Sequence, residues 1–449
     1  MATKELTQGN PLKLILLFAF PIFLGNVFQQ FYNLVDALIV GRYIGIEALG
    51  AVGATGPLIF LLISFIFAST QGFSVVLAQN FGARNYDMVR KSLCTAFVLA
   101  GILTVILTLI SVPLTRTALV ALKTPSDILD MSTTYLFIMF AGIFATVFYN
   151  VSSNTIRAVG DSKTPLYFLI FASFLNIFLD ILFITKFKMG IAGAGYATVL
   201  SQGISTVLCL SYMFFKFPIL RPKKSDWKLD KDFVYEHLRI GIPMGFQMSV
   251  LTLGMIALQY VLNGFGTSAV AGFTTAMRID QTFCQAYLAL GATMATFSAQ
   301  NFGAGKLSRI KEGAKNASAI VVIVSIIAIL TLTFYARPLT LIFMSQPDEV
   351  VIGYAVEYLH ITMMFYIFIG FLFVFRHTLQ GMGSVIVPLL SGFVELIARG
   401  CCAFILGYSF GYTGLCYATP AAWISGALVL FIGYRINLKK NAKRNKLSA

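Results

Sequence analysis

Long runs of apolar residues alternate along the chain with short polar stretches, and most of the charged residues lie in the polar stretches. A helix needs about 20 apolar residues, each contributing about 1.5 Å, to cross a hydrocarbon layer about 30 Å thick. The chain contains twelve runs of this kind, so we predict an all-α membrane protein with twelve transmembrane helices. Their approximate limits are residues 14–40, 48–78, 89–112, 131–155, 164–185, 190–215, 236–262, 267–300, 311–335, 352–375, 386–408 and 413–435.

The two halves of the chain repeat each other. The pentapeptide QNFGA occurs at residues 79–83 and again at 300–304, which is 221 positions later. Pro21 corresponds to Pro243 at a spacing of 222, and Pro165 corresponds to Pro388 at a spacing of 223. Six helices per half is an even number, so both halves enter the membrane in the same orientation. We therefore predict two pseudo-symmetric six-helix bundles around a central cavity.

The longest polar interruption lies between the two repeats, at residues 216–232, and contains two prolines. It divides the chain into a predicted N-terminal lobe (1–215), a basic cytoplasmic linker (216–235), a C-terminal lobe (236–436) and a basic cytoplasmic tail (437–449). In QNFGA, glycine permits a turn and asparagine can cap a helix. We interpret this motif as the end of the second helix of each lobe and not as a ligand contact.

The composition supports a membrane location, because 58% of the residues are hydrophobic, 11% are charged and the mean hydropathy is +0.82. Soluble domains have about 25% charged residues. With the N-terminus in the cytoplasm, 25 of the 33 Lys and Arg residues, Arg376 included, fall on the cytoplasmic side. The positive-inside rule therefore predicts a multi-pass protein of the cell membrane with both termini in the cytoplasm.

The net charge, the cysteines and the histidines indicate which kinds of partner and cofactor to expect. The net charge of +15 is spread over loops without a nucleic-acid-binding signature, so nucleic acid is not an expected partner. The six cysteines have no CxxC spacing and the three histidines are scattered, which indicates neither a disulfide framework nor a histidine metal site. We expect no cofactor, and the lipid bilayer and small molecules as partners.

Acidic residues inside the predicted helices need an explanation, because a carboxylate at the bilayer centre costs on the order of 3 kcal/mol. Four of the 18 acidic residues lie well inside: Asp36, Asp180, Asp280 and Glu395. Glu395 and Arg399 are four residues apart and can form an ion pair across one helical turn, so we favour a structural role for them over a substrate contact. Arg278 and Asp280 are two residues apart and point in different directions, and both a structural role and a substrate contact stay open for them.

Asp36 and Asp180 have no cation near them in the sequence. Tyr32 precedes Asp36 by one turn, and Asn176 precedes Asp180 by one turn. If these two helix faces meet, their oxygen atoms form a site that can coordinate Na⁺ or take up a proton. The corresponding repeat positions are Leu258 and Ala403, so the acids occur in one half only. We predict that they bind a coupling cation.

Together these features resemble the multidrug and toxic compound extrusion (MATE) family, in its prokaryotic DinF-like branch. The resemblance covers the twelve spans, Pro21 in the first helix, Asp36 fifteen residues later and the NxxxD motif of the fifth helix. It implies a cation site in the N-terminal lobe and a first helix that bends at Pro21. The matching site positions are Asp36, Tyr135, Asn176, Asp180 and Thr198, with Tyr32 nearby.

In the other main bacterial branch of that family, acids in the C-terminal lobe bind the cation. The seventh helix of this chain reads PMGFQMSVLTL and contains no glutamate there. This departure argues against a cation site in the second lobe.

The function that we expect is secondary active antiport. A functional monomer would export amphipathic, often cationic, organic compounds in exchange for H⁺ or Na⁺, and the choice between the two cations stays open. The alternative is a flippase for a lipid-linked or polysaccharide precursor, which has the same superfamily plan. An intramembrane enzyme is not expected, because the sequence lacks a GxSxG motif and paired histidines.

Overall fold

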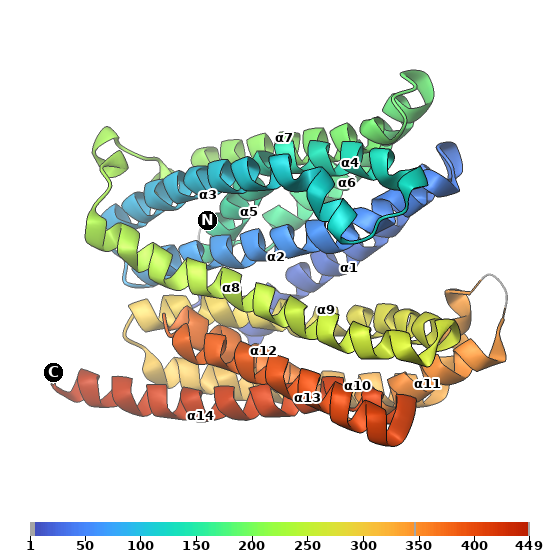
Figure 1. The fold of residues 1–449 in the computed structure, drawn as a ribbon. Coiled ribbons are helices and arrows are strands. Elements are labelled where there is room, and N and C mark those ends of the chain that lie inside the picture. The colour runs from blue at the N-terminus through green and yellow to red at the C-terminus, as the bar shows by residue number, and fades with distance from the viewer. Residues whose placement is uncertain (1–4, 345–346, 448–449) are drawn as a thin grey trace. The chain divides into compact units, whose positions relative to one another are not determined.

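The computed structural model describes residues 5–344 and 347–447, and every regular element in this part of the chain is helical (Figure 1). Lys4 and the last two residues of the predicted tail lie outside the described residues. The α-helices are α1 (Pro11–Tyr43), α2 (Ile46–Gly82), α3 (Tyr86–Ala121), α4 (Ser126–Ala141), α5 (Ile143–Ala158), α6 (Thr164–Ile181), α7 (Ile191–Lys216), α8 (Lys231–Leu262), α9 (Thr267–Gly303), α10 (Leu307–Ile342), α11 (Glu349–Met363), α12 (Tyr366–Gly381), α13 (Ile386–Cys416) and α14 (Ala418–Leu447). The short helices are η1 (Leu182–Lys186), η2 (Pro218–Leu220), η3 (Lys224–Trp227) and η4 (Asn263–Phe265).

The all-α membrane fold is confirmed. Within the described ranges, nine single helices are long and apolar enough to cross a membrane, and two bent pairs raise that number to eleven. The remaining long helix, α9, has 37 residues but carries Arg278 and Asp280 within its length. The described helices are therefore consistent with a twelve-helix bundle.

Two of the predicted helices are broken and not continuous. The α4–α5 pair bends by 44° at Gly142, and the α11–α12 pair bends by 55° around Met364. These two positions are 222 residues apart, as expected for equivalent positions of the repeat. Only the first of them is a glycine, so the break is a property of the duplicated fold and not of one residue type.

The turns of the backbone repeat as well. Residues with positive φ occur in four pairs, each with one member in the first half of the chain and one at the equivalent position of the second half. In three of these pairs both residues are glycines. In the fourth pair Arg84, with φ of 58°, takes the place of a glycine. The four pairs are Gly45 and Gly266, Arg84 and Gly305, Gly160 and Gly383, and Gly190 and Gly411.

The chain forms two compact units, as far as its residues are described. Unit 1 contains Met1–Glu5 and Leu24–Gly245, and unit 2 contains Leu6–Phe23 and Phe246–Ala449. The division falls inside α1 and α8, two residues after Pro21 and two residues after Pro243. Each of these helices therefore contributes residues to both units.

Close packing of small residues joins α8 to α2 within unit 1. Gly241 and Gly245 are four residues apart on α8, and Gly241 packs directly against Gly72 of α2. A Cβ atom on Gly241 would lie 2.4 Å from the ring of Phe73, and one on Gly245 would lie 2.3 Å from the hydroxyl oxygen of Ser69. This is the GxxxG type of helix contact, in which the lack of side chains lets two backbones approach.

The predicted linker is held on the surface of unit 1. Asp226, in η3, is buried, and its carboxylate accepts hydrogen bonds from Nε of Arg90 at 3.1 Å and from the backbone N–H of Lys223 at 2.8 Å. Arg90 lies in the first two turns of α3. The linker is therefore fixed to one end of α3.

The QNFGA motif does end a helix in both copies, as predicted, because α2 ends at Gly82 and α9 ends at Gly303. The second copy has a further role. Gln300 Oε1 accepts from the backbone N–H of Leu6 at 2.9 Å, and Asn301 Nδ2 donates to the carbonyl of Leu6 at 3.2 Å. Arg309 donates to the carbonyl of Gly9 at 2.9 Å. Unit 2 therefore holds the segment that leads into α1.

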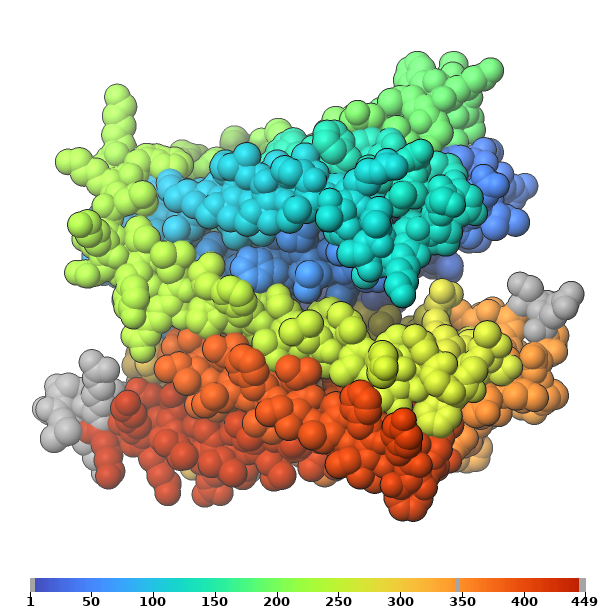
Figure 2. Space-filling view, viewed as in Figure 1, coloured from blue at the N-terminus to red at the C-terminus, as the bar shows by residue number. Residues whose placement is uncertain are grey.

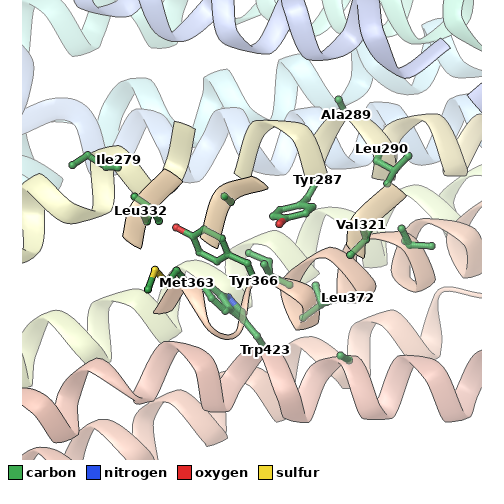
Figure 3. Close-up of a cluster of buried hydrophobic side chains, with 14 of the residues drawn as sticks. Ile279, Tyr287, Ala289, Leu290, Val321, Leu332, Met363, Tyr366, Leu372 and Trp423 are labelled. Atoms are coloured by element: carbon green, nitrogen blue, oxygen red, sulfur yellow. The ribbon is translucent and has the colours of Figure 1, made fainter. Parts of the chain in front are cut away.

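Aromatic side chains fill the core of unit 2 (Figure 3). Tyr366 of α12 lies between Tyr287 of α9 and Trp423 of α14, with ring centroids 6.4 and 6.1 Å apart. The hydroxyl of Tyr287 is hydrogen-bonded to that of Ser325 at 2.8 Å. The core of unit 2 thus ties together the three helices α9, α12 and α14.

Large apolar side chains also cover outer faces of the units. On the face in view in Figure 2, much of the surface of unit 2 belongs to α13 and α14. On α13, Ile397 and Ile405 are more than 60% exposed. Exposed isoleucine on a whole helix face is typical of a surface in contact with lipid.

The contact between α2 and α8 predicts a specific sensitivity. Gly241→Val forces a side chain into the Phe73 ring and should destabilise the protein by about 1–3 kcal/mol. Gly53→Val is the matched control, because nothing lies within 4 Å of a Cβ atom at that position of α2. Thermal unfolding of the detergent-solubilised variants measures the difference, and equal midpoints for the two would contradict the packing argument.

Candidate functional site

Four helices of unit 1 bring the predicted site residues together. Asp36 and Tyr32 lie one turn apart on the part of α1 that belongs to unit 1. Asn176 and Asp180 lie one turn apart on α6 and are fully buried, with exposed fractions of 1% and 0%. The two remaining residues are Tyr135 of α4 and Thr198 of α7, both of which are buried.

The two carboxyl groups meet at the centre of this cluster. The side chains of Asp36 and Asp180 lie within hydrogen-bonding reach of each other. Tyr135 is near enough to both carboxyl groups to interact with them electrostatically, and so is Tyr32. We call this group of six side chains, Tyr32, Asp36, Tyr135, Asn176, Asp180 and Thr198, the carboxylate cluster.

The amide of Asn176 connects the members of the carboxylate cluster. In the orientation that gives both of its polar atoms a partner, its nitrogen donates to Oδ2 of Asp180 at 2.8 Å and to the hydroxyl oxygen of Tyr32 at 3.1 Å. Its oxygen accepts from the backbone N–H of Thr198 at 3.1 Å. Asn176 therefore links α1, α6 and α7 at the depth of the two carboxyl groups.

A close approach of the bent α4–α5 pair to α7 positions the remaining two residues. A Cβ atom on Gly142, at the bend, would lie 2.3 Å from Val199 of α7. Gly195 of α7 packs in the same way against Ile138 of α4. These contacts bring the backbones of α4 and α7 together, and Tyr135 and Thr198 lie on the two helices near these contacts.

The helix that carries Asp180 changes its geometry immediately afterwards. The α-helical hydrogen bonding of α6 ends at Ile181, and η1, at Leu182–Lys186, is a π-helix. π-Helical turns inside longer helices occur frequently at functional sites, because they re-aim side chains and free backbone groups.

The surroundings of the carboxylate cluster are apolar. Tyr135 packs in a cluster of buried residues with Ile39, Val40 and Ala194. No ion pair within the described ranges involves Asp36 or Asp180, and each has one carboxylate oxygen that accepts no hydrogen bond from a described residue. Two carboxyl groups in contact and away from a cation repel each other when both are ionised. A cation bound between them removes that repulsion.

The donor set fits a small hard cation. The carboxylate cluster offers the carboxylate oxygens of Asp36 and Asp180 and the hydroxyl oxygens of its tyrosines and Thr198, and oxygen atoms are the ligands that hard cations such as Na⁺ prefer. Among the described residues, no group of three or more His, Cys, Asp or Glu residues is suited to hold a metal ion. The same oxygens can share a proton between Asp36 and Asp180. The geometry is compatible with both cations.

Arg278 and Asp280 point in different directions, as their spacing predicts. Arg278 is exposed, whereas Asp280 has an exposed fraction of 4%. The thiol of Cys284 contacts Oδ2 of Asp280 at 3.9 Å, and the Tyr366 hydroxyl faces the same carboxylate. Asp280 is thus surrounded by neutral groups of unit 2.

The predicted ion pair between Glu395 and Arg399 is wrong. Glu395 pairs instead with Arg376 of α12, and both are buried, with exposed fractions of 2% and 4%. The hydroxyl of Ser391 also donates to Oε1 of Glu395 at 2.8 Å. Arg376 lies on a neighbouring helix, so its side chain can approach the carboxylate of Glu395 directly. Arg399 lies on the same helix as Glu395, so its side chain would have to run along the helix surface to reach that carboxylate. Arg399 is buried close to Glu395 and Tyr358, and its Nε atom has no partner among the described residues.

Sequence reasoning missed the role of Arg376 because it assigned this residue to the cytoplasmic charges. Its neighbours gave a signal: Arg376 follows the continuous apolar run FLFVF, which extends into the membrane. A second network was also missed. Gln380 donates to Gln247 at 2.9 Å, and Gln247 donates to the carbonyl of Pro388 at 2.5 Å, all within unit 2.

Known proteins are similar to this chain over most of its length. The family model MatE matches residues 21–182 and again residues 243–412. The "Probable multidrug resistance protein YpnP" of Bacillus subtilis (strain 168) is 32% identical over 99% of both chains. The "Multidrug export protein MepA" of Staphylococcus saprophyticus is 25% identical over 89% of this chain and 88% of its own.

Solved structures share the fold. One, described as the outward-facing conformation of a multidrug resistance MATE family transporter of the MOP superfamily, has a TM-score of 0.92 at 23% identity and covers 98% of this chain and 99% of its own. A MATE in the straight conformation has a TM-score of 0.91 at 23% identity, with coverages of 99% and 100%. A MATE in the bent conformation has a TM-score of 0.91 at 24% identity, with 99% for both.

The buried ion pair of unit 2 yields a stability prediction. Arg376→Met removes the guanidinium that forms the ion pair with the buried Glu395 and should cost about 3–5 kcal/mol. The double variant Arg376→Met/Glu395→Gln removes both charges and should recover most of that loss. Thermal unfolding of the two variants tests this, and a double variant as unstable as the single one would show that the charge balance is not the cause.

Proposed function

Because the chain belongs to the MatE family of membrane transporters, we propose that it is a secondary active antiporter that exports amphipathic, often cationic, organic compounds in exchange for H⁺ or Na⁺. The names of its relatives as multidrug resistance and multidrug export proteins support drug-like compounds as substrates. The repeated fold supports alternating access, which is the mechanism of transporters that are built from internal repeats. One chain supplies both lobes and suffices as the functional unit.

The observation that carries this proposal is the contact between Asp36 and Asp180 in the absence of a cationic partner among the described residues. Such a pair is costly in a membrane unless a cation visits it. The hydroxyl of Tyr32 lies near that pair, and the amide nitrogen of Asn176 donates to both Asp180 and Tyr32. We assign it as the coupling site for H⁺ or Na⁺.

The conformational effect of cation binding is transmitted to the rest of the protein through α1. Asp36 lies on the part of α1 that belongs to unit 1, whereas Leu6–Phe23 belongs to unit 2. Between them stands Pro21, which cannot donate a backbone hydrogen bond and weakens the helix at that point. A cation that draws Asp36 and Asp180 together changes the bend of α1. Solved structures with this fold are described as a MATE in the straight conformation and a MATE in the bent conformation, and these descriptions support two such states.

The free energy that is needed to drive export is modest. A cation shifts the equilibrium between two states only by the difference in its affinity for them. One elementary charge moving through 100 mV supplies about 2.3 kcal/mol. One or two cations per cycle are enough to drive useful accumulation of the exported compound on the outside.

The orientation is part of the proposal. The concentration of Lys and Arg in alternate loops supports a cytoplasmic location for both termini. A flippase for a lipid-linked precursor is the alternative within the same superfamily plan, and the names of the relatives favour drug export over it.

Neutralising Asp36 should abolish coupling. In proteoliposomes with an imposed pH or Na⁺ gradient, Asp36→Asn should lower gradient-driven ethidium transport at least tenfold, because one of the two carboxyl groups can no longer exchange a cation. The control is Asp127→Asn, an exposed acid in the first turn of α4 without an ion pair among the described residues. The gradient that drives the unaltered protein identifies the cation, and full activity of the Asp36 variant would refute the assignment.

Straightening α1 should slow transport without removing the site. Pro21→Ala restores a backbone donor to α1, and we expect at least a fivefold lower export rate with unchanged cation binding. Pro113→Ala is the control, because Pro113 lies inside α3, which belongs to unit 1 alone. The measurements are ethidium export and cation binding by isothermal titration calorimetry. A Pro21 variant with the normal rate would rule out bending at this residue.

A further inference from the structure

A groove runs along one end of unit 2 between α10 and α14. It has a volume of about 940 Å³. Both helices pack against α12, and Phe375 of α12 lies between them in the groove. The α10 wall includes Leu307 and Ala314, and the α14 wall includes Phe431 and Leu438. The floor and the walls are therefore apolar.

Cations line the rim of this groove on both sides. Lys311 and Lys315 stand one turn apart on α10, and Arg435 and Lys439 stand one turn apart on α14. All four are exposed, and none forms an ion pair with a described residue. Glu312 is the one acid among the described lining residues. The rim thus carries a local excess of three positive charges.

An unpaired hydroxyl lies in the same place. Tyr434 lines the groove and has an exposed fraction of 6%, yet its hydroxyl has no hydrogen-bond partner among the described residues. A buried hydroxyl without a partner is unfavourable, so a ligand that accepts a hydrogen bond from it is bound more tightly. The groove also includes the N-terminal end of α10, which begins at Leu307, and the positive end of the helix dipole there favours an anion.

We propose that this groove binds an anionic phospholipid, with the phosphate on the cations of the rim and an acyl chain on the apolar floor. Charge selects an anion, and the apolar floor selects a ligand with a hydrocarbon chain. The four cations belong to the stretches that the charge distribution assigns to the cytoplasmic side, where anionic lipids of that leaflet are within reach. A free phosphate would use the rim but leave the floor uncovered, and a zwitterionic lipid would cover the floor but leave the excess charge.

The proposal is tested by lipid titration of the full-length protein in detergent, with bound lipid counted by native mass spectrometry. The probes are phosphatidylglycerol and phosphatidylcholine with the same acyl chains. We expect phosphatidylglycerol to bind at least tenfold more tightly to the unaltered protein. The variant Lys311→Gln/Lys315→Gln/Arg435→Gln/Lys439→Gln should lose this preference.

The matched control removes four cations elsewhere. Lys216→Gln/Lys224→Gln/Lys228→Gln/Lys231→Gln changes the net charge equally but alters residues around the linker, all of them exposed. Its preference for phosphatidylglycerol should stay within twofold of the unaltered protein. An equal loss in both quadruple variants would show that net charge alone attracts the lipid, and would overturn the proposal.

Two single substitutions separate the parts of the site and keep the test valid if the quadruple variant fails to fold. Tyr434→Phe removes the hydroxyl and should weaken phosphatidylglycerol binding about threefold or more, whereas Ala442→Trp fills the groove and should weaken it without changing a charge. Normal binding by both would overturn the proposal. Displacement of the lipid by millimolar inorganic phosphate would also overturn it, because it would indicate a site for free anions. Equal binding of phosphatidylglycerol and phosphatidylcholine would overturn it as well.

Discussion

The high free energy of an ionised group in a hydrocarbon layer governs this structure, because every buried charge requires a partner or a function. The two units meet this requirement differently. In unit 2, Glu395 has Arg376 as its counter-charge. In unit 1, Asp36 and Asp180 have only each other and neutral polar groups as partners among the described residues. Glu395 is therefore neutralised within the protein, whereas the pair of carboxyl groups in unit 1 requires an external cation.

Much of the fold could be predicted from the sequence, because a membrane helix is identified by its own length and hydropathy. The repeat added the relation between the halves, since Pro21 and Pro243 mark equivalent positions. The bends at Gly142 and Met364 were not predicted, because both helix pairs are continuously apolar. At the first bend Gly142 packs closely against Val199 of another helix, a contact that the sequence alone does not reveal.

The candidate site shows the same limit. Asp36 and Asp180 were found because an acid in an apolar run is conspicuous and has no cation one turn away. Tyr135 and Thr198 carry no such signal, and only the family resemblance indicated them. The partner of Glu395 was assigned wrongly because spacing reveals contacts within one helix and says nothing about the neighbouring helix. Sequence patterns thus locate isolated charges well and pair them poorly.

The attachment of Leu6–Gly9 to Gln300, Asn301 and Arg309 has a mechanical consequence. A helix whose N-terminal end is free can rotate as a whole when a residue near its other end moves, so the movement is not passed on to the rest of the protein. A helix whose end is attached must instead bend along its length or move the residues to which it is attached. Because the N-terminal end of α1 is held in this way, a displacement of Asp36 must either bend α1 near Pro21 or strain the contacts that hold Leu6–Gly9 in unit 2.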